Sequence, residues 1–137
     1  MIRKANVQDA MAISELDSHM FKDSLGFAFI ENDLKNNPMA SYFVAVIEDR
    51  IVGYIGAWVA DNTSILNFCV LDDYQKQGIG GLLFDEVLKI KVGMLSLEVR
   101  VTNEKAIRFY TKRGFVKALL RKNYYSNHED AILMIRK

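Results

Sequence analysis

The spacing of hydrophobic residues in the first part of the chain is helical. Residues 7–16 place apolar side chains on one helical stripe, and residues 26–36 repeat the pattern until Asn37-Pro38 ends it. The side chain of Asn6 can cap the first of these helices. The segment before them, residues 1–5, is long enough for a short strand. We therefore predict one strand followed by two helices.

The middle of the chain changes to strand-forming residues. β-Branched and aromatic side chains fill three runs, and polar turn residues separate the runs from one another. The three runs are residues 42–47, 51–59 and 64–71. Because the connections are short, we predict three consecutive antiparallel strands.

The last part of the chain alternates between the helical and the strand pattern. A helix that begins near Gly78 carries its apolar residues on one stripe, and Asp85 and Lys89 are spaced to form an ion pair on its other side. A further helix starts at Thr102 or Asn103 and stops at Gly114. Strands are predicted at residues 94–101, 115–122 and 130–136.

The element order predicts the fold class. One strand, two helices, three strands, helix, strand, helix and two strands make an α/β fold, in which a mixed, mostly antiparallel sheet carries helices on both faces. No linker, repeat or low-complexity stretch interrupts the 137 residues. We therefore expect a single domain over residues 1–137.

Composition restricts the possible partners. The chain is 50% hydrophobic and 26% charged with a formal net charge of +1, and it lacks the basic face of a nucleic-acid-binding protein. No apolar stretch reaches the roughly 20 residues that span a bilayer, and the charged first segment is unlike a signal peptide. A single cysteine, Cys69, cannot form an internal disulfide and suits a reducing compartment. We expect a cytoplasmic monomer or weak dimer without direct contact to nucleic acid or membrane.

A glycine-rich segment, Gln75-Lys76-Gln77-Gly78-Ile79-Gly80-Gly81, links a predicted strand to a predicted helix. Glycines leave backbone N–H groups accessible, and a helix N-terminus carries partial positive charge, so this corner suits phosphate groups. Leu83 stands where a dinucleotide fingerprint needs its third glycine, and the Gly-Lys-Ser/Thr of a P-loop is missing. The segment is therefore a phosphate site of another kind or a tight turn at a helix start.

Two residues further along the chain could carry chemistry. Glu98 lies in the predicted strand 94–101, although a strand inside an α/β sheet should be apolar on both faces. A charge in such a place needs a partner or a chemical role, and an ion pair or a solvated end of the sheet is the alternative. Tyr110 lies on the inward stripe of the next helix, where core packing is the simpler explanation.

Together these segments resemble the GCN5-related N-acetyltransferase family. Gln75-x-x-Gly78-x-Gly80 is similar to its pyrophosphate loop. Leu97-Glu98-Val99-Arg100-x-x-Asn103, followed by Tyr110, is similar to the RimI branch, the ribosomal-protein-alanine N-acetyltransferases. The same branch is matched further on by Gly114-Phe115, by Arg121-Lys122-Asn123-Tyr124-Tyr125 and by Glu129-Asp130-Ala131.

The resemblance implies an N-acetyltransferase domain that uses acetyl-coenzyme A and no metal. It implies that Glu98 is the general base and Tyr110 the general acid. It further implies that coenzyme A is held by the strand before the loop, by the loop and by the start of the last helix. These cofactor-binding residues are Phe68, Cys69, Val70, Lys76, Gln77, Gly78, Ile79, Gly80, Gly81 and Asn103.

The resemblance also implies the acceptor, a protein N-terminus. Tyr124 and Tyr125 stand where N-terminal acetyltransferases hold the first residues of a peptide, and ordinary hairpin packing is the alternative for this pair. By resemblance, the acceptor is the alanine-starting end of a small-subunit ribosomal protein. Two other functions remain open: acetylation of lysine side chains or a small amine, and coenzyme A binding without turnover.

Direct attack by an amine needs these residue types. The amine must be neutral, which at pH 7 holds for about one α-amine in ten but only about one lysine in two thousand. A carboxylate can take the amine proton, a tyrosine can protonate the leaving thiolate, and backbone N–H groups can stabilise the oxyanion. The alternative nucleophile, Cys69, has no activating histidine nearby in the sequence, so we predict no covalent intermediate. The histidines and acidic residues show no metal-ligand spacing.

Overall fold

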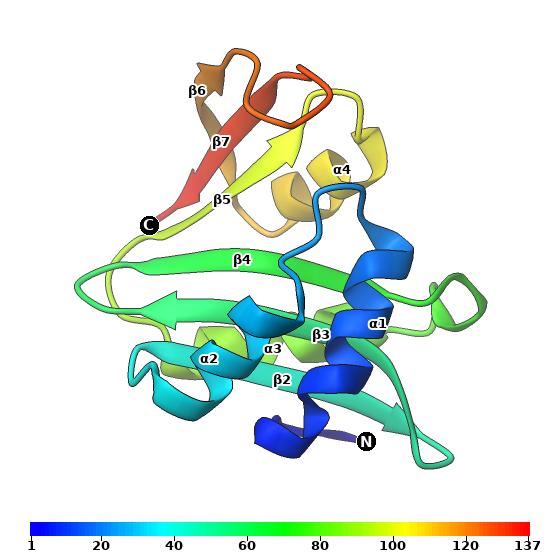
Figure 1. The fold of residues 1–137 in the computed structure, drawn as a ribbon. Helices are drawn as coiled ribbons and strands as arrows, with labels where there is room; N and C mark the ends of the chain where they lie inside the picture. Colours follow the sequence, from blue (N-terminus) through cyan, green and yellow to red (C-terminus); the bar gives the residue numbers. More distant parts are fainter.

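A seven-stranded sheet organises the chain in the computed structural model, which describes residues 1–137 (Figure 1). Its strand order is β1-β2-β3-β4-β5-β7-β6, and only β4 and β5 pair in parallel. The α/β prediction with a mostly antiparallel sheet is confirmed. The strands are β1 (Ile2–Lys4), β2 (Ala40–Ile47), β3 (Arg50–Val59), β4 (Thr63–Val70), β5 (Leu95–Arg100), β6 (Val116–Arg121) and β7 (Ala131–Arg136).

Helices cover both faces of this sheet (Figure 1). Apolar residues of the first two helices form one core cluster, and those of the last two helices form a second, larger cluster that includes β5. None of the helices combines the length and the apolar character that crossing a bilayer requires. The helices are α1 (Ala10–Met20), α2 (Phe27–Asn36), α3 (Ile79–Ile90) and α4 (Glu104–Lys112), with short 3₁₀ turns at η1 (Val7–Asp9) and η2 (Asp72–Tyr74).

Local side-chain contacts explain where the helices begin. Asn6 Oδ1 accepts from Gln8 N at 3.0 Å, while Asn6 N–H donates to Asp9 Oδ2 at 2.9 Å, which is a capping box ahead of α1. Of the two residues predicted to cap α4, the structure uses Asn103, whose Oδ1 accepts from Ala106 N at 3.2 Å. These polar side chains replace the backbone acceptors that the first helical turns lack.

One predicted ion pair on α3 was wrong. Lys89 Nζ lies 3.1 Å from Glu86 Oε1, three residues back, rather than pairing with Asp85. Residues three apart and residues four apart are both neighbours on a helix surface, so the sequence alone could not decide which carboxylate pairs with Lys89.

The sheet splits between β4 and β5. These strands pair only at Thr63–Leu95 and Ser64–Ser96, and beyond these residues β5 diverges from β4 (Figure 1). On its other edge, β5 pairs with β7 along its whole length. Thr63 stabilises the end of the split where the two strands still pair. Its Oγ1 accepts from Val92 N and donates to Val92 O, both at 2.9 Å. The open end of this split is the position of the candidate site.

Candidate active site

The split leaves the edge of β4 that faces β5 without a partner strand. Leu71 N–H donates to Val52 O at 2.8 Å, which marks a hydrogen-bonded pair of the β3–β4 ladder. Such pairs alternate along an antiparallel ladder, and the register runs on unshifted through Phe68. The backbone of Cys69 therefore faces β3, while the backbones of Phe68 and Val70 face the split. Of the three residues of this strand predicted to hold coenzyme A, Phe68 and Val70 thus point their backbone amides into the split, and Cys69 does not.

A cavity of about 100 Å³ lies where the strands separate. Its walls come from β4, β5, α4 and the segments that follow α1 and β6. Five of the residues singled out from the sequence line it together: Phe68, Glu98, Asn103, Tyr110 and Tyr125.

Glu98 and Tyr110 reach this cavity from opposite faces of the sheet. Leu97 and Val99 belong to the same buried cluster as Tyr110, on the side of α3 and α4. Because side chains alternate along a strand, Glu98 projects toward the side of α1 and α2. A base on one face and an acid on the other would flank a molecule threaded through the split.

A weak ion pair is the alternative explanation for Glu98. Its Oε1 lies 3.7 Å from Arg121 Nε on β6, and the Glu98 side chain is 27% exposed. A partly exposed pair at this distance contributes little to stability. The ion pair therefore leaves the carboxylate free to meet a ligand in the cavity.

Tyr110 is protonated and open to the cavity. Its residue is only 7% exposed, and burial raises the pKa of its hydroxyl, with smaller contributions from Cys69 and Tyr125. The Tyr110 hydroxyl has no hydrogen-bond partner in the protein. Every fully buried side-chain polar atom in the structure has such a partner. The hydroxyl oxygen is therefore accessible, and it is accessible from the cavity that Tyr110 lines. The rings of Phe109 and Phe115 pack edge-on against it at 5.4 Å. The ring is thus packed in place, and its protonated hydroxyl faces the cavity.

Cys69 is unsuited to nucleophilic attack. Its side chain is buried in the cluster formed by α1 and α2, and burial raises the pKa of the thiol, with Asp17 adding to the rise. A raised pKa keeps the sulfur out of its nucleophilic thiolate form. The structure thus agrees with a mechanism that uses no covalent cysteine intermediate.

The glycine-rich segment forms the start of α3 at the end of β4. Lys76 and Gly78 have positive φ angles of 63° and 82°, and the helix makes its first backbone hydrogen bond from Leu82 N to Gly78 O at 3.1 Å. The N–H groups of residues 79–81 therefore have no backbone acceptor, and they add to the positive end of the helix dipole. Gln75 Nε2 holds the corner in place by donating to Val70 O at 2.8 Å. Such an arrangement favours a phosphate group.

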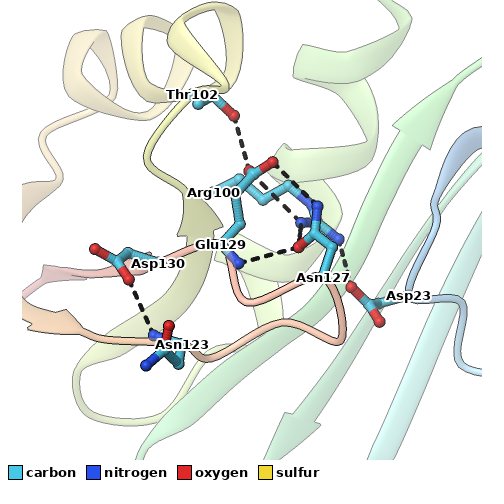
Figure 2. A network of polar contacts seen from close by, with 7 residues as sticks. All are labelled: Asp23, Arg100, Thr102, Asn123, Asn127, Glu129 and Asp130. Carbon is cyan, nitrogen blue, oxygen red and sulfur yellow. Dashed lines mark hydrogen bonds and ion pairs between the residues drawn. The ribbon is translucent and has the colours of Figure 1, made fainter.

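Arg100 connects three segments beside the cavity: β5, the loop after α1 and the β6–β7 loop (Figure 2). Its guanidinium contacts Asp23 after α1, donates to Asn127 Oδ1 at 3.0 Å, and lies 3.5 Å from Glu129 Oε2. The same group stacks over the ring of Tyr125, 3.9 Å from its centroid. Arg100 therefore fixes the loop after α1 and the β6–β7 loop relative to the cavity.

Of the two tyrosines predicted to bind the acceptor, Tyr124 and Tyr125, only Tyr125 lines the cavity. Tyr125 lines the cavity beneath Arg100, and burial raises its pKa to about 12. Tyr124 is 50% exposed and does not line the cavity, although its ring packs edge-on against Tyr125 at 5.0 Å. Only Tyr125 is placed to contact a molecule inside.

Sequence reasoning missed three polar residues of this cavity: Asp23, Asn67 and Arg100. Arg100 could have been found, because it alternates with Glu98 on the same face of one strand. Asp23 and Asn67 carried no pattern that marked them. No group of three or more His, Cys, Asp or Glu side chains is arranged to hold a metal ion.

Comparison with known proteins agrees with this geometry. Residues 8–115 match the description "Acetyltransferase (GNAT) family". A Bacillus subtilis protein, provisionally named ribosomal protein bS18-alanine N-acetyltransferase, is 32% identical over 97% of this chain and 92% of its own length. An N-alpha-acetyltransferase of Saccharolobus solfataricus is 29% identical over 98% of this chain and 91% of its own. The crystal structure of the ribosomal-protein-S18-alanine N-acetyltransferase from Escherichia coli matches with a TM-score of 0.88 at 28% identity, covering 99% of this chain and 92% of that one.

Proposed function

The chain belongs to the acetyltransferase (GNAT) family and is an acetyl-coenzyme A-dependent N-acetyltransferase, and on that premise we propose that it acetylates the α-amine of an alanine-starting protein N-terminus, with a small-subunit ribosomal protein as acceptor. The observation that carries the proposal is the cavity at the β4–β5 split, which Glu98 and Tyr110 enter from opposite faces. The names of the relatives from Bacillus subtilis and Escherichia coli support the alanine acceptor.

Three segments would hold the co-substrate. Acetyl-coenzyme A supplies the thioester whose carbonyl carbon the amine attacks. The backbone N–H groups of Phe68 and Val70, at the open edge of β4, would hold the acetyl-pantetheine arm and the developing oxyanion. The free N–H groups of residues 79–81 would receive the pyrophosphate, and Asn103, which lines the cavity at the start of α4, would contact the coenzyme as well.

The acceptor would enter from the face of α1 and α2. Tyr125, held beneath Arg100, would contact its first residues, and Glu98 would take a proton from its amine directly or through a water. The new C–N bond would form first, leaving the carbonyl oxygen as an oxyanion, and the C–S bond would break when the C=O bond forms again. The thiolate on the opposite face would take its proton from Tyr110.

A series of peptides that differ only at the first residue tests the acceptor. Because the first residue of the acceptor and the acetyl group must share this cavity, a bulky first side chain should fit poorly. We expect kcat/KM to be at least about tenfold higher for the alanine-starting peptide than for the leucine- or phenylalanine-starting one. Forcing a larger side chain into a packed site costs about 1–3 kcal/mol, which corresponds to a difference of this size.

The same series can be extended to the rest of the acceptor. Alanine-starting peptides that copy the N-termini of small-subunit ribosomal proteins should react faster than peptides of the same composition in scrambled order. Equal or faster reaction of the leucine and phenylalanine peptides would contradict the small-residue acceptor. Equal reaction of ordered and scrambled peptides would remove the ribosomal part of the proposal alone.

A further inference from the structure

A buried carboxylate lies directly behind the acceptor side of the cavity. Asp17, on α1, has 0% exposure and accepts three hydrogen bonds. The donors are Tyr54 Oη at 2.5 Å, Leu25 N at 2.6 Å and Asn67 Nδ2 at 2.8 Å. All three partners are donors, which suits an ionised carboxylate because such a group only accepts.

This carboxylate fixes which way the Asn67 side chain points. A flipped amide would place its oxygen against the Asp17 oxygen, setting two acceptors face to face. Asp17 holds Asn67 Nδ2, and Asn67 Oδ1 has no hydrogen-bond partner in the protein. Every fully buried side-chain polar atom in the structure has such a partner. Asn67 Oδ1 is therefore accessible. Asn67 lines the cavity at the split, so the accessible oxygen belongs to the cavity wall.

The position of this oxygen suits an amine. Asn67 faces α1, as its bond to Asp17 shows, and Glu98 projects to the same face from the other strand of the split. A carbonyl oxygen accepts from an amine N–H. The hydrogen bond to a carboxylate also polarises the amide and makes its oxygen a stronger acceptor.

We propose that Asn67 Oδ1 binds an N–H of the acceptor amine and that Asp17 is the positioning residue that holds this oxygen in place. The inference rests on the proposed function and adds a residue to its acceptor site. Asn67 on β4 takes one N–H while Glu98 on β5 receives the proton that is removed. The nitrogen lone pair is left free for the thioester carbon between the two strands.

Two peptides that differ only in the amine test this contact. One is an alanine-starting peptide, and in the other a propionyl group replaces the alanine residue, so that only the amine is missing. Their dissociation constants are measured on the enzyme saturated with coenzyme A, which cannot transfer an acetyl group. The wild type should bind the amine peptide about 10–100-fold more tightly, as expected for hydrogen bonds to a charged group. In Asn67→Ala that advantage should fall by about tenfold, as expected for the loss of one hydrogen bond to a charged group, while binding of the propionyl peptide stays the same.

Asn36→Ala is the matched control, because this exposed amide on α2 bonds only to Asn32 and lies outside the cavity. Equal weakening of both peptides by Asn67→Ala would show a structural role only, and an unchanged amine advantage would show no role, so either result overturns the proposal. If the wild type acetylates no peptide α-amine at all, the proposed function fails instead.

A crystal structure of the wild type with coenzyme A and the alanine peptide tests the same contact without any variant. Asn67 Oδ1 should lie about 2.7–3.2 Å from the peptide nitrogen. An amine bound elsewhere in the cavity, with no contact to Asn67, overturns the proposal even if Asn67→Ala does not fold.

Discussion

Replacing Glu98 by glutamine is expected to lower kcat by about 100- to 10,000-fold at pH 7. Glutamine keeps the size of the side chain but cannot accept the amine proton. The loss should shrink as the pH rises toward about 8, because the neutral fraction of an α-amine increases about tenfold per pH unit below its pKa. Steady-state rates with saturating peptide and acetyl-coenzyme A, measured across this pH range, check both statements.

Arg121→Gln separates a catalytic Glu98 from a structural one. Arg121 is the ion-pair partner of Glu98 and lies outside the cavity lining. If the ion pair were the only role of Glu98, removing either partner would have the same effect. We expect Arg121→Gln to stay within a fewfold of the wild type, and both variants to bind acetyl-coenzyme A normally. Equal losses in the two variants would contradict the assignment of Glu98 as the base.

Replacing Tyr110 by phenylalanine is expected to lower kcat by about 100-fold or more. The ring still packs against Phe109 and Phe115, so the variant should fold, and only the proton donor is lost. Since burial raises the pKa of Tyr110, the wild type should not lose activity through its ionisation anywhere below about pH 10. The pH profile and the kcat of the variant are the measurements.

An acetyl donor with a more acidic thiol distinguishes a proton donor from a packing residue. A weakly basic thiolate leaves without help, so such a donor should restore most of the rate of Tyr110→Phe while changing the wild type little. A loss that is the same with both donors would mean that Tyr110 only shapes the cavity.

Periodicity predicted the elements of the fold because each element obeys a local rule. The alternation of apolar and polar residues in Leu95–Arg100 placed Glu98 opposite Leu97 and Val99, and the structure has this arrangement. Side-chain chemistry predicts a helix cap at Asn6 and another at Thr102 or Asn103, and the structure has caps at Asn6 and Asn103. The α/β class followed from the order of these elements.

The polar contacts around the cavity could not be predicted in the same way. Arg100 meets Asp23 across 77 residues of sequence, and their contact depends on how α1 and β5 are placed in space. Asp17 looked like any polar residue of an amphipathic helix, yet it is buried because α1 packs against β3 and β4 beside Tyr54 and Asn67. Register also decided that the backbone of Cys69 faces β3 rather than the split.

Family membership leaves the nature of the acceptor amine as the central question. The chain is an acetyl-coenzyme A-dependent enzyme, which sets aside the alternative of coenzyme A binding without turnover. Only a neutral amine can attack the thioester. At pH 7 a lysine amine is neutral about 200-fold less often than an α-amine, so a lysine acceptor would need far more help from a general base. Tyr125 and Arg100 stack on one another and line the cavity beside the split, where we propose that the acceptor peptide binds.

Mass spectrometry of two peptides incubated with the enzyme and acetyl-coenzyme A answers this question most directly. One peptide has a free alanine N-terminus and no lysine, and the other has a blocked N-terminus and one internal lysine. We predict that only the first gains an acetyl group and that Glu98→Gln abolishes most of this gain at pH 7. Acetylation of the lysine peptide alone would contradict the account and assign the enzyme to side-chain or small-amine acceptors.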